Sequence, residues 1–240
     1  MNILALGAHP DDLEIYMFGT LSAFAERGDR LTLAIATDGA KGGREDGVGL
    51  SQQRKGEARA AAALLDTEPR FLDFPDGALL ADASLVGVLG DLIAEVLPDL
   101  IVTHAPNDYH RDHRALSQAV ALASSFSAPV LYADTLGGVA FTPTHYIDIT
   151  SRFEQKTEAI LCHRSQDPQR FVLGAQRLNN FRAGQANNPE GYAEAFRFEP
   201  IYPFVDIRDL LPPAPPVRPV RNRNRPEPNL PNGGPAASEV

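Results

Sequence analysis

Ile3-Leu4-Ala5-Leu6-Gly7-Ala8-His9-Pro10-Asp11-Asp12 joins a short apolar run to a histidine and two adjacent carboxylates. The run 3–6 predicts a buried first strand. The polar residues after it would then lie at the carboxyl edge of a parallel sheet, where open α/β folds bind their ligands. A second cluster, His110-Arg111-Asp112-His113, follows the apolar run Leu100-Ile101-Val102. Two polar clusters, each beyond a buried strand, predict one metal site assembled from two loops.

Apolar runs alternate with amphipathic stretches along most of the chain. Strands that alternate with helices at this spacing form right-handed βαβ units. We therefore expect an α/β fold in a single domain, with a Rossmann-like, mostly parallel sheet flanked by helices. Ser84 is the expected N-cap of one helix. The expected strands are 3–6, 31–36, 70–73, 100–103, 130–133 and 146–149, and the expected helices are 14–27, 52–65, 84–97, 114–124, 151–162 and 168–182.

The composition changes near the C-terminal end. Nine of the 20 prolines lie in the last 29 residues. Proline-rich stretches of this kind do not build a packed core. The sequence predicts a folded domain over residues 1–211 and a disordered tail over residues 212–240.

Composition also limits the classes of function. The chain has 240 residues, 43% of them hydrophobic, and a formal charge of 22 − 31 = −9. A negative surface argues against nucleic-acid binding, which needs a basic stripe. The sequence has no apolar run of about 18 residues, so no membrane span is expected. The chain enters a strand without a signal-peptide pattern, and its lone Cys162 forms no intrachain disulfide. Both features predict a cytoplasmic protein.

The two clusters offer more donor atoms than one metal needs. A catalytic zinc site commonly uses three side chains from His, Asp, Glu or Cys and leaves one position for water. Either cluster alone is also compatible with a turn of solvated acids or an exposed helix start. The combination of the two favours a metal site. The first loop offers His9, Asp11 and Asp12, and the second offers His104, Asp108, His110, Asp112 and His113.

Both clusters resemble the signatures of a known family. Ala8-His9-Pro10-Asp11-Asp12-Leu13-Glu14-Ile15 resembles the first signature of the LmbE/PIG-L family of zinc-dependent N-deacetylases, and Asn107-Asp108-Tyr109-His110-Arg111-Asp112-His113 resembles the second. The likeness covers about residues 2–200. Further similar segments are Thr37-Asp38-Gly39, Arg54 with Glu57, Phe74-Pro75-Asp76-Gly77 and His163-Arg164-Ser165-Gln166.

The resemblance implies a division of roles among these residues. His9, Asp12 and His113 would be the metal ligands, Asp11 the catalytic carboxylate, and His110 the residue facing the substrate carbonyl. Zinc is the expected ion and iron(II) the alternative, since two histidines and one aspartate suit both. The metal would acidify a water, Asp11 would accept its proton and later protonate the amine, and a protonated His110 would stabilise the oxyanion.

Asp112 is a candidate for orienting His110 or a ligand histidine, and an N-cap role for the following helix is equally compatible. Weaker predictions concern the substrate. Arg54 is expected to bind substrate, and Asp38 either bonds a sugar hydroxyl or caps a loop. Lys41 and Arg44, in the glycine-rich loop 38–47, are candidates for an anionic substituent, and Tyr109 for the pocket wall or the oxyanion.

The remaining histidines, His104, His145 and His163, are expected to be structural, although the last lies in a family-like segment. Tyr16 and Phe18 stand where family members commonly carry glycines, and Arg111 stands where proline is frequent. These departures remove no predicted ligand. Tyr16 and Phe18 predict altered packing near the site or at an oligomer contact, and Arg111 predicts a looser turn.

The predicted function is metal-dependent removal of an N-acetyl group from an N-acetylglucosamine-type amino sugar or its conjugate, thiol-cofactor precursors included. A homo-oligomer is expected only by analogy with the family. The alternative is a non-catalytic, metal-stabilised sugar-binding protein of the same fold, which would need neither Asp11 nor His110. A nucleotide-binding Rossmann module lacks support because Gly-x-Gly-x-x-Gly is absent after the first strand. A serine hydrolase would need Gly-x-Ser-x-Gly, which the sequence does not contain.

Overall fold

The computed structural model describes residues 1–43 and 47–220. Its centre is a seven-stranded sheet in the order β3-β2-β1-β4-β5-β7-β6. The first five strands are parallel, and β7 runs antiparallel to both β5 and β6. The strands are β1 (Asn2–Gly7), β2 (Arg30–Thr37), β3 (Arg70–Phe74), β4 (Leu100–His104), β5 (Val130–Ala133), β6 (His145–Asp148) and β7 (Ala193–Phe198).

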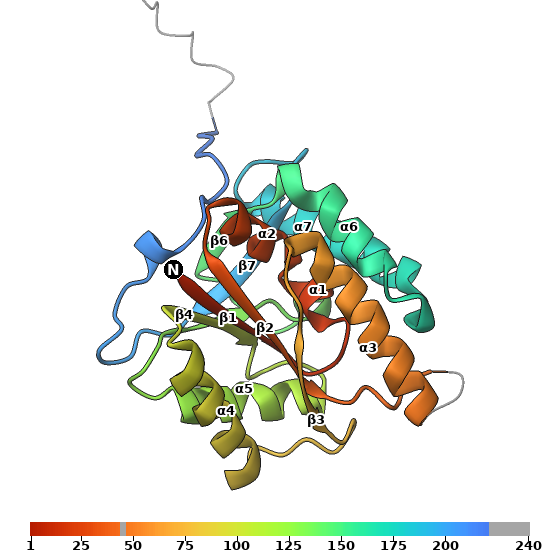
Figure 1. Cartoon of the computed structure of the whole chain (residues 1–240). Helices are drawn as coiled ribbons and strands as arrows, with labels where there is room; N and C mark the ends of the chain where they lie inside the picture. The colour runs from red at the N-terminus through yellow and green to blue at the C-terminus, as the bar shows by residue number, and fades with distance from the viewer. Residues whose placement is uncertain (44–46, 221–240) are drawn as a thin grey trace, which may run out of the picture.

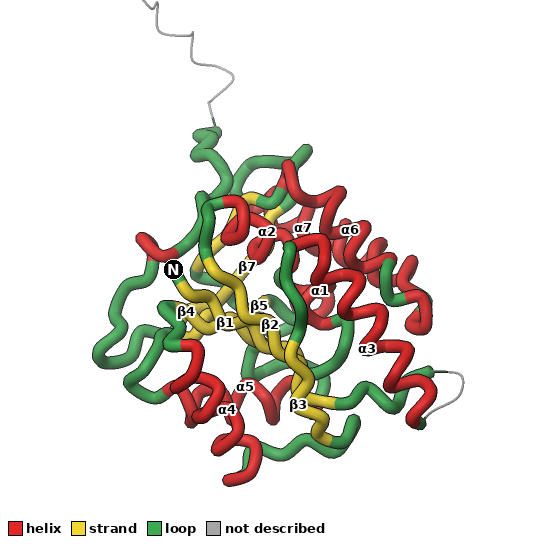
Figure 2. The backbone as a smooth tube through the Cα atoms, viewed as in Figure 1, coloured by secondary structure: helices red, strands yellow, loops and turns green. Residues whose placement is uncertain are grey.

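Helices cover both faces of the sheet (Figures 1 and 2). Helices α4 and α5 lie on one face and the others on the opposite face. This arrangement confirms the predicted single-domain α/β fold with a mostly parallel sheet. The helices are α1 (Asp12–Tyr16), α2 (Phe18–Glu26), α3 (Val48–Ala62), α4 (Ala83–Val96), α5 (Arg111–Ser124), α6 (Phe153–Leu161) and α7 (Pro168–Gln185).

Strand β1 is buried on both sides because its side chains alternate between two hydrophobic cores. Ile3 and Ala5 pack under α1, α2 and α3, whereas Leu4 and Leu6 pack under α4 and α5. A strand in this central position can be apolar at every residue. The apolar run therefore fixes β1 in the middle of the sheet, with the polar residues 9–12 at its end.

Several predicted helix boundaries differ from the structure, among them that of the helix expected over 52–65, which is α3 (Val48–Ala62). The helix expected over 14–27 is two helices that meet at Met17. Helix α4 is capped by the Asp82 carboxylate, which accepts from the N–H groups of residues 84 and 85, so the prediction of a Ser84 cap was wrong. Helix α5 begins at Arg111 rather than at residue 114, because the His110 side chain accepts from the Asp112 N–H and caps it. His113 consequently lies in its first turn.

Residues after β7 have little regular structure. Pro212 and Pro215 are buried, and the carbonyl of Pro213 accepts a hydrogen bond from Asp148 N–H of edge strand β6. Residues 212–220 thus contact the domain, while residues 221–240 of the predicted tail lie outside the described residues. The boundary at 211 stays a prediction.

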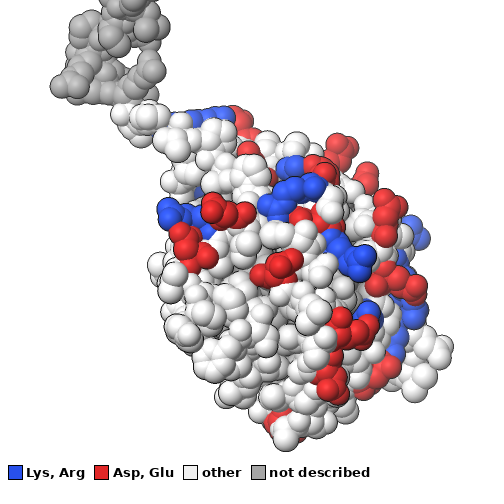
Figure 3. All heavy atoms as spheres, turned by 60° about the vertical axis from the view of Figure 1, so that its left-hand side comes forward, with Lys and Arg blue, Asp and Glu red and all other residues white. Residues whose placement is uncertain are grey.

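No helix among the described residues is long and apolar enough to cross a membrane. On the face seen in Figure 3, basic and acidic side chains lie side by side over the upper and right-hand parts. A broad area of the same face carries neither.

Candidate metal centre and active site

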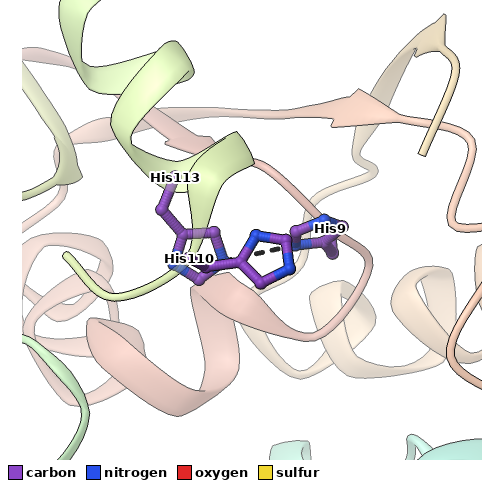
Figure 4. A group of neighbouring side chains, drawn as sticks. All are labelled: His9, His110 and His113. Atoms are coloured by element: carbon purple, nitrogen blue, oxygen red, sulfur yellow. Dashed lines mark hydrogen bonds between the residues drawn. The ribbon is translucent and has the colours of Figure 1, made fainter. Parts of the chain in front are cut away.

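The site lies where the sheet changes its direction of winding. From β1 the chain continues to β2 on one side, and from β4 it continues to β5 on the other. Ligands of open α/β sheets bind at such a switch point. His9 lies in the loop after β1, whereas His110 and His113 lie at the start of α5, after β4. Figure 4 shows these three imidazoles converging from the two segments.

Donor atoms of three side chains lie at the separations expected of metal ligands. His9 Nδ1 is 3.2 Å from His113 Nε2 and 3.3 Å from Asp12 Oδ2, and Asp12 Oδ1 is 3.2 Å from His113 Nε2. A tetrahedral ion with bonds of about 2.0–2.1 Å separates its ligand atoms by about 3.3 Å. All three side chains are buried. Two imidazoles and a carboxylate can therefore hold zinc or iron(II) here.

Further donors surround these three side chains. The groups able to hold a cation overlap, because His9 also belongs with His110 and His113 and with Asp76 and Asp112. A third group combines Asp12 and His113 with His104.

Carboxylates face the outer nitrogens of both histidines. His9 Nε2 lies 3.3 Å from Asp76 Oδ1 and 3.4 Å from Asp112 Oδ2. The Asp112 oxygen also accepts from Gly77 N–H at 2.7 Å. His113 Nδ1 lies 3.1 Å from Asp108 Oδ1. Such partners fix the orientation of metal-binding imidazoles and raise their basicity. The Asp112 carboxylate thus faces His9, and the N-cap alternative for Asp112 is wrong because His110 holds the cap position of α5. The role of Asp112 as an orienting residue stays a prediction.

The cluster concentrates negative charge around the histidines. Burial lowers the pKa of His9, but hydrogen bonds to Asp112, Asp12 and Asp76 outweigh burial and raise that pKa well above its usual value. Burial also opposes protonation of His113, yet the charge of Asp12 and a hydrogen bond to Asp108 raise its pKa to about 9. The pKa of Asp12 is held well below its usual range by the neighbouring histidines, against the effect of burial. An environment that draws protons onto two buried imidazoles also favours a divalent cation in their place.

Asp11 lines the cavity beside the site, and its carboxylate is paired with Arg54 rather than with the histidines. It is buried immediately before α1, and its Oδ1 lies 3.2 Å from Arg54 Nη2. Burial raises the pKa of Asp11, and the charge of Arg54 opposes that rise. The two adjacent aspartates thus have different neighbours, because Asp11 pairs with Arg54 whereas Asp12 lies against the histidines.

His110 is positioned to donate a hydrogen bond. Its Nδ1 accepts from Asp112 N–H at 3.2 Å, so the proton of the neutral ring is on Nε2. Burial, together with the neighbouring charges of His9 and His113, lowers the pKa of His110. The geometry favours a neutral donor at this position, whereas the sequence-based expectation was a protonated imidazole.

A cavity of about 340 Å³ opens over these groups. Asp11, His110 and the three metal-site residues line it, and so do three of the predicted substrate residues, Arg54, Lys41 and Tyr109. Asp38 is not part of the lining. Its carboxylate accepts from Ala40 N–H and Asp76 N–H, which is the loop-capping alternative. Arg44 lies outside the described residues.

Arg54 is buried and engaged with protein groups. Its guanidinium donates to the carbonyls of Gly39 and Lys41, besides facing Asp11. Gly39 has φ of 62°, and an added Cβ would lie 2.8 Å from Pro10 Cδ, so only glycine fits this close approach of the two loops. Arg54 thereby holds the glycine-rich loop against the loop that carries Asp11. A direct contact with substrate stays a prediction.

Sequence reasoning missed several residues of the site. His104 was named among the possible donors but received no role in the site; its Nε2 lies 3.1 Å from Asp12 Oδ2 and its ring stacks on His113. Its position directly at the end of β4 was the available signal. Asp76 lay in a quoted family-like segment but received no role. Tyr16, noted as a departure, packs edge-on against the rings of His104 and His113.

Comparison with known proteins agrees with this fold. Residues 4–124, half of the chain, match the PIG-L family, described as GlcNAc-PI de-N-acetylase. The chain belongs to this family.

Two curated relatives carry different activities. The diacetylchitobiose deacetylase of Thermococcus kodakarensis is 27% identical over 233 residues, covering 85% of this chain and 87% of the relative. The 4-oxalmesaconate hydratase of Pseudomonas putida is 26% identical over 189 residues, covering 68% and 73%. Among solved structures, the 4-carboxy-2-hydroxymuconate hydratase of Pseudomonas putida superposes with a TM-score of 0.74 at 23% identity, covering 86% of this chain and 98% of that one.

Proposed function

We propose that this protein is a metal-dependent hydrolase that removes the N-acetyl group from an N-acetylglucosamine-type amino sugar or its conjugate. His9, Asp12 and His113 are the proposed metal ligands, with zinc as the ion and iron(II) as the alternative. The observation that carries the proposal is the presence of both Asp11 and His110 in the wall of the cavity, beside the donor atoms of His9, Asp12 and His113. A purely structural metal site needs neither group. The family and the deacetylase relative support the same reaction.

A divalent cation held at this position supplies acidity to a water and polarises an amide carbonyl. Asp11 accepts the proton of the attacking water. Burial raises the pKa of Asp11 toward the working range of a group that must take up a proton and then release it. Arg54 keeps the carboxylate in place through its 3.2 Å contact. Asp11 then delivers the proton to the departing amine.

His110 acts on the other side of the amide. Its Nε2–H donates to the carbonyl oxygen as negative charge develops there. The hydrogen bond from Asp112 N–H to Nδ1 holds the ring in the tautomer that this role needs. His110 therefore stabilises the oxyanion without a change in its own charge.

The proposal includes a small-molecule amino-sugar substrate and a cytoplasmic setting. Conjugates of N-acetylglucosamine, including precursors of thiol cofactors, belong to the proposed substrate class. Lys41 and Tyr109 line the cavity and are the proposed additional contacts for such a substrate.

A second candidate function is the addition of water to an unsaturated polycarboxylate. The observation that favours it is the group of three cationic side chains, Lys41, Arg54 and Arg170, in the cavity lining, together with the hydratase relative. Incubation with 4-oxalmesaconate and a chromatographic assay of the hydrated product test this candidate. Hydration with no acetate release from any N-acetyl sugar would replace the main proposal.

The deciding experiment combines metal analysis with acetate release from N-acetylglucosamine and diacetylchitobiose. We expect about one zinc or iron ion per chain and release of acetate. Asp11→Asn should retain the metal and lose about 10²- to 10⁴-fold in turnover, the range expected when a general acid–base group is removed. His113→Ala should lose both metal and turnover.

Asp66→Asn is the matched control, because Asp66 is an exposed carboxylate outside the cavity. It should change neither property. Full activity in Asp11→Asn would exclude Asp11 as the base. Retention of metal and sugar binding without acetate release by the unaltered protein would favour the non-catalytic alternative.

A further inference from the structure

A second hollow continues the catalytic cavity across Tyr109, Arg170 and Phe171, which line both. Its volume is about 570 Å³. It lies between helix α7 and the 3₁₀ turn η2 (Leu136–Gly138). Positions 170, 174, 177, 178 and 181 of α7 all line it, and this spacing places them on one face of the helix. We call this hollow the α7 groove.

The walls of the α7 groove combine apolar and cationic side chains. Phe181 is 57% exposed and Leu136 is 37% exposed, so apolar surface faces water beside the site. Exposed apolar surface in a hollow is typical of a ligand site. Phe171 and Leu178 extend this surface toward the catalytic cavity.

Two arginines in the α7 groove are available to a ligand. Arg170 and Arg177 are exposed, and within residues 1–43 and 47–220 neither forms an ion pair. The third arginine of the same helix, Arg182, is by contrast buried and bound to Asp134 at 2.6 Å. Arg170 lies over the ring of Phe171. Two guanidinium groups without a carboxylate partner among the described residues, beside apolar walls, fit a ligand that has an apolar body and an anionic substituent.

Gly174 keeps the middle of the α7 groove open. It lies inside an α-helix, where glycine is less stable than alanine. No atom lies within 4 Å of a Cβ added there, so packing of the protein does not require glycine. A small residue at this position instead leaves space on the groove face of the helix.

We propose that the α7 groove determines substrate specificity by binding the group attached to the amino sugar, and that this group is apolar and carries an anionic substituent. The link to an amino sugar rests on the proposed deacetylase function. Binding of an apolar anion in the groove does not rest on it.

The test compares three substrates: N-acetylglucosamine, its phenyl β-glycoside and its 4-carboxyphenyl β-glycoside. Acetate release gives kcat/KM for each, and calorimetric titration gives Kd for the glycosides on the inactive Asp11→Asn protein. We expect kcat/KM to rise from the first substrate to the third. Arg177→Gln should lower the ratio of the carboxyphenyl to the phenyl glycoside about tenfold, as loss of one charged hydrogen bond predicts. Gly174→Leu should lower kcat/KM for both glycosides relative to N-acetylglucosamine.

Gly87→Leu and Arg59→Gln are the matched controls. Gly87 also lies in a helix with no atom within 4 Å of an added Cβ, and Arg59 is an exposed arginine of α3. Both should leave the ratios unchanged. An equal effect of Gly174→Leu on all three substrates, or none on any, would overturn the proposal.

Two further outcomes separate the alternatives. If Gly174→Leu impairs N-hexanoylglucosamine but not the glycosides, the groove accepts the acyl chain and the proposal is wrong. In the other outcome, no substrate releases acetate, but the carboxyphenyl glycoside binds and Gly174→Leu raises its Kd. The proposed deacetylase function is then wrong, while the assignment of the α7 groove as a binding site stands.

Discussion

Two clusters of buried charge in this molecule differ in how completely their atoms are paired. In the first, Lys156 Nζ lies 2.6 Å from Glu194 Oε1, and both side chains are fully buried. Glu194 also accepts from Gly19 N–H and Thr20 N–H at the start of α2. The second is the metal-site cluster. In the described chain, three of its buried atoms have no hydrogen-bond partner, namely His104 Nδ1, Asp108 Oδ2 and Asp112 Oδ1.

This difference in pairing suits a structural role for the Lys156–Glu194 pair and a binding role for the metal-site cluster. A buried charge is tolerated when its partners are all provided by the fold, as they are for Lys156 and Glu194. Leaving buried polar atoms without partners costs free energy, so such atoms are kept where a ligand or catalytic step uses them. The metal-site cluster contains buried polar atoms without hydrogen-bond partners, whereas the side-chain atoms of Lys156 and Glu194 are paired.

The largest expected change in stability comes from breaking the complete pair. Lys156→Met leaves Glu194 buried without its cation, and we expect the free energy of unfolding to fall by about 3–5 kcal/mol. Urea denaturation of the metal-loaded protein measures this loss. Adding Glu194→Gln should recover part of it, because glutamine carries no charge and can still accept from Gly19 N–H. If Lys156→Met were as stable as the unaltered protein, the Lys156–Glu194 pair would not have the structural role assigned to it.

A smaller change in the free energy of unfolding is expected when a metal ion binds to the metal-site cluster. Zinc added to metal-free protein at about a hundredfold excess over its Kd should raise the free energy of unfolding by about 2.7 kcal/mol. Thermal unfolding with and without zinc measures the gain. In His113→Ala, with one ligand removed, the zinc response should be lost. An identical zinc response in that variant would show that the ion binds elsewhere.

The smallest effect is expected from removing the charge of Asp112, one of the two carboxylates that face His9 Nε2. Asp112→Asn retains an oxygen near His9 Nε2 but removes its charge, and the metal Kd should weaken about 10- to 100-fold. Competition with a chelating dye measures this Kd. Asp82→Asn serves as a control, because asparagine also caps a helix and position 82 lies in the cap of α4. Unchanged affinity in Asp112→Asn would assign the orientation of His9 to Asp76 alone.

The sequence predicted the central features of the fold because they depend on local patterns. The apolar run of β1 and the alternation of strands and helices were sufficient for the parallel part of the sheet. Strand β7 was missed, because Ala193–Phe198 contains two alanines and one Glu–Arg pair of interior charges, and its partners β5 and β6 are distant in sequence. Antiparallel pairing at this end of the sheet is a long-range contact that no local pattern specifies.

The candidate site shows the same limit. His9, Asp12 and His113 were singled out by the motifs, and the structure brings their donor atoms together. The contacts of Asp76 with His9 and of Asp108 with His113 depend on how the loops after β3 and β4 fold back. A residue's chemical type is visible in the sequence, but its partner across the sheet edge is not.

The contact of Pro213 with β6 covers part of an open border of the sheet. Strand β6 is the last strand on its side, and unpaired peptide groups at such a border recruit strands from other molecules. The carbonyl of Pro213 occupies one of these groups, the N–H of Asp148. Proline has no N–H to offer a further strand, so this covering stops the ladder of hydrogen bonds. Shortening the chain before residue 212 would consequently favour self-association through the border of β6 and aggregation at high concentration.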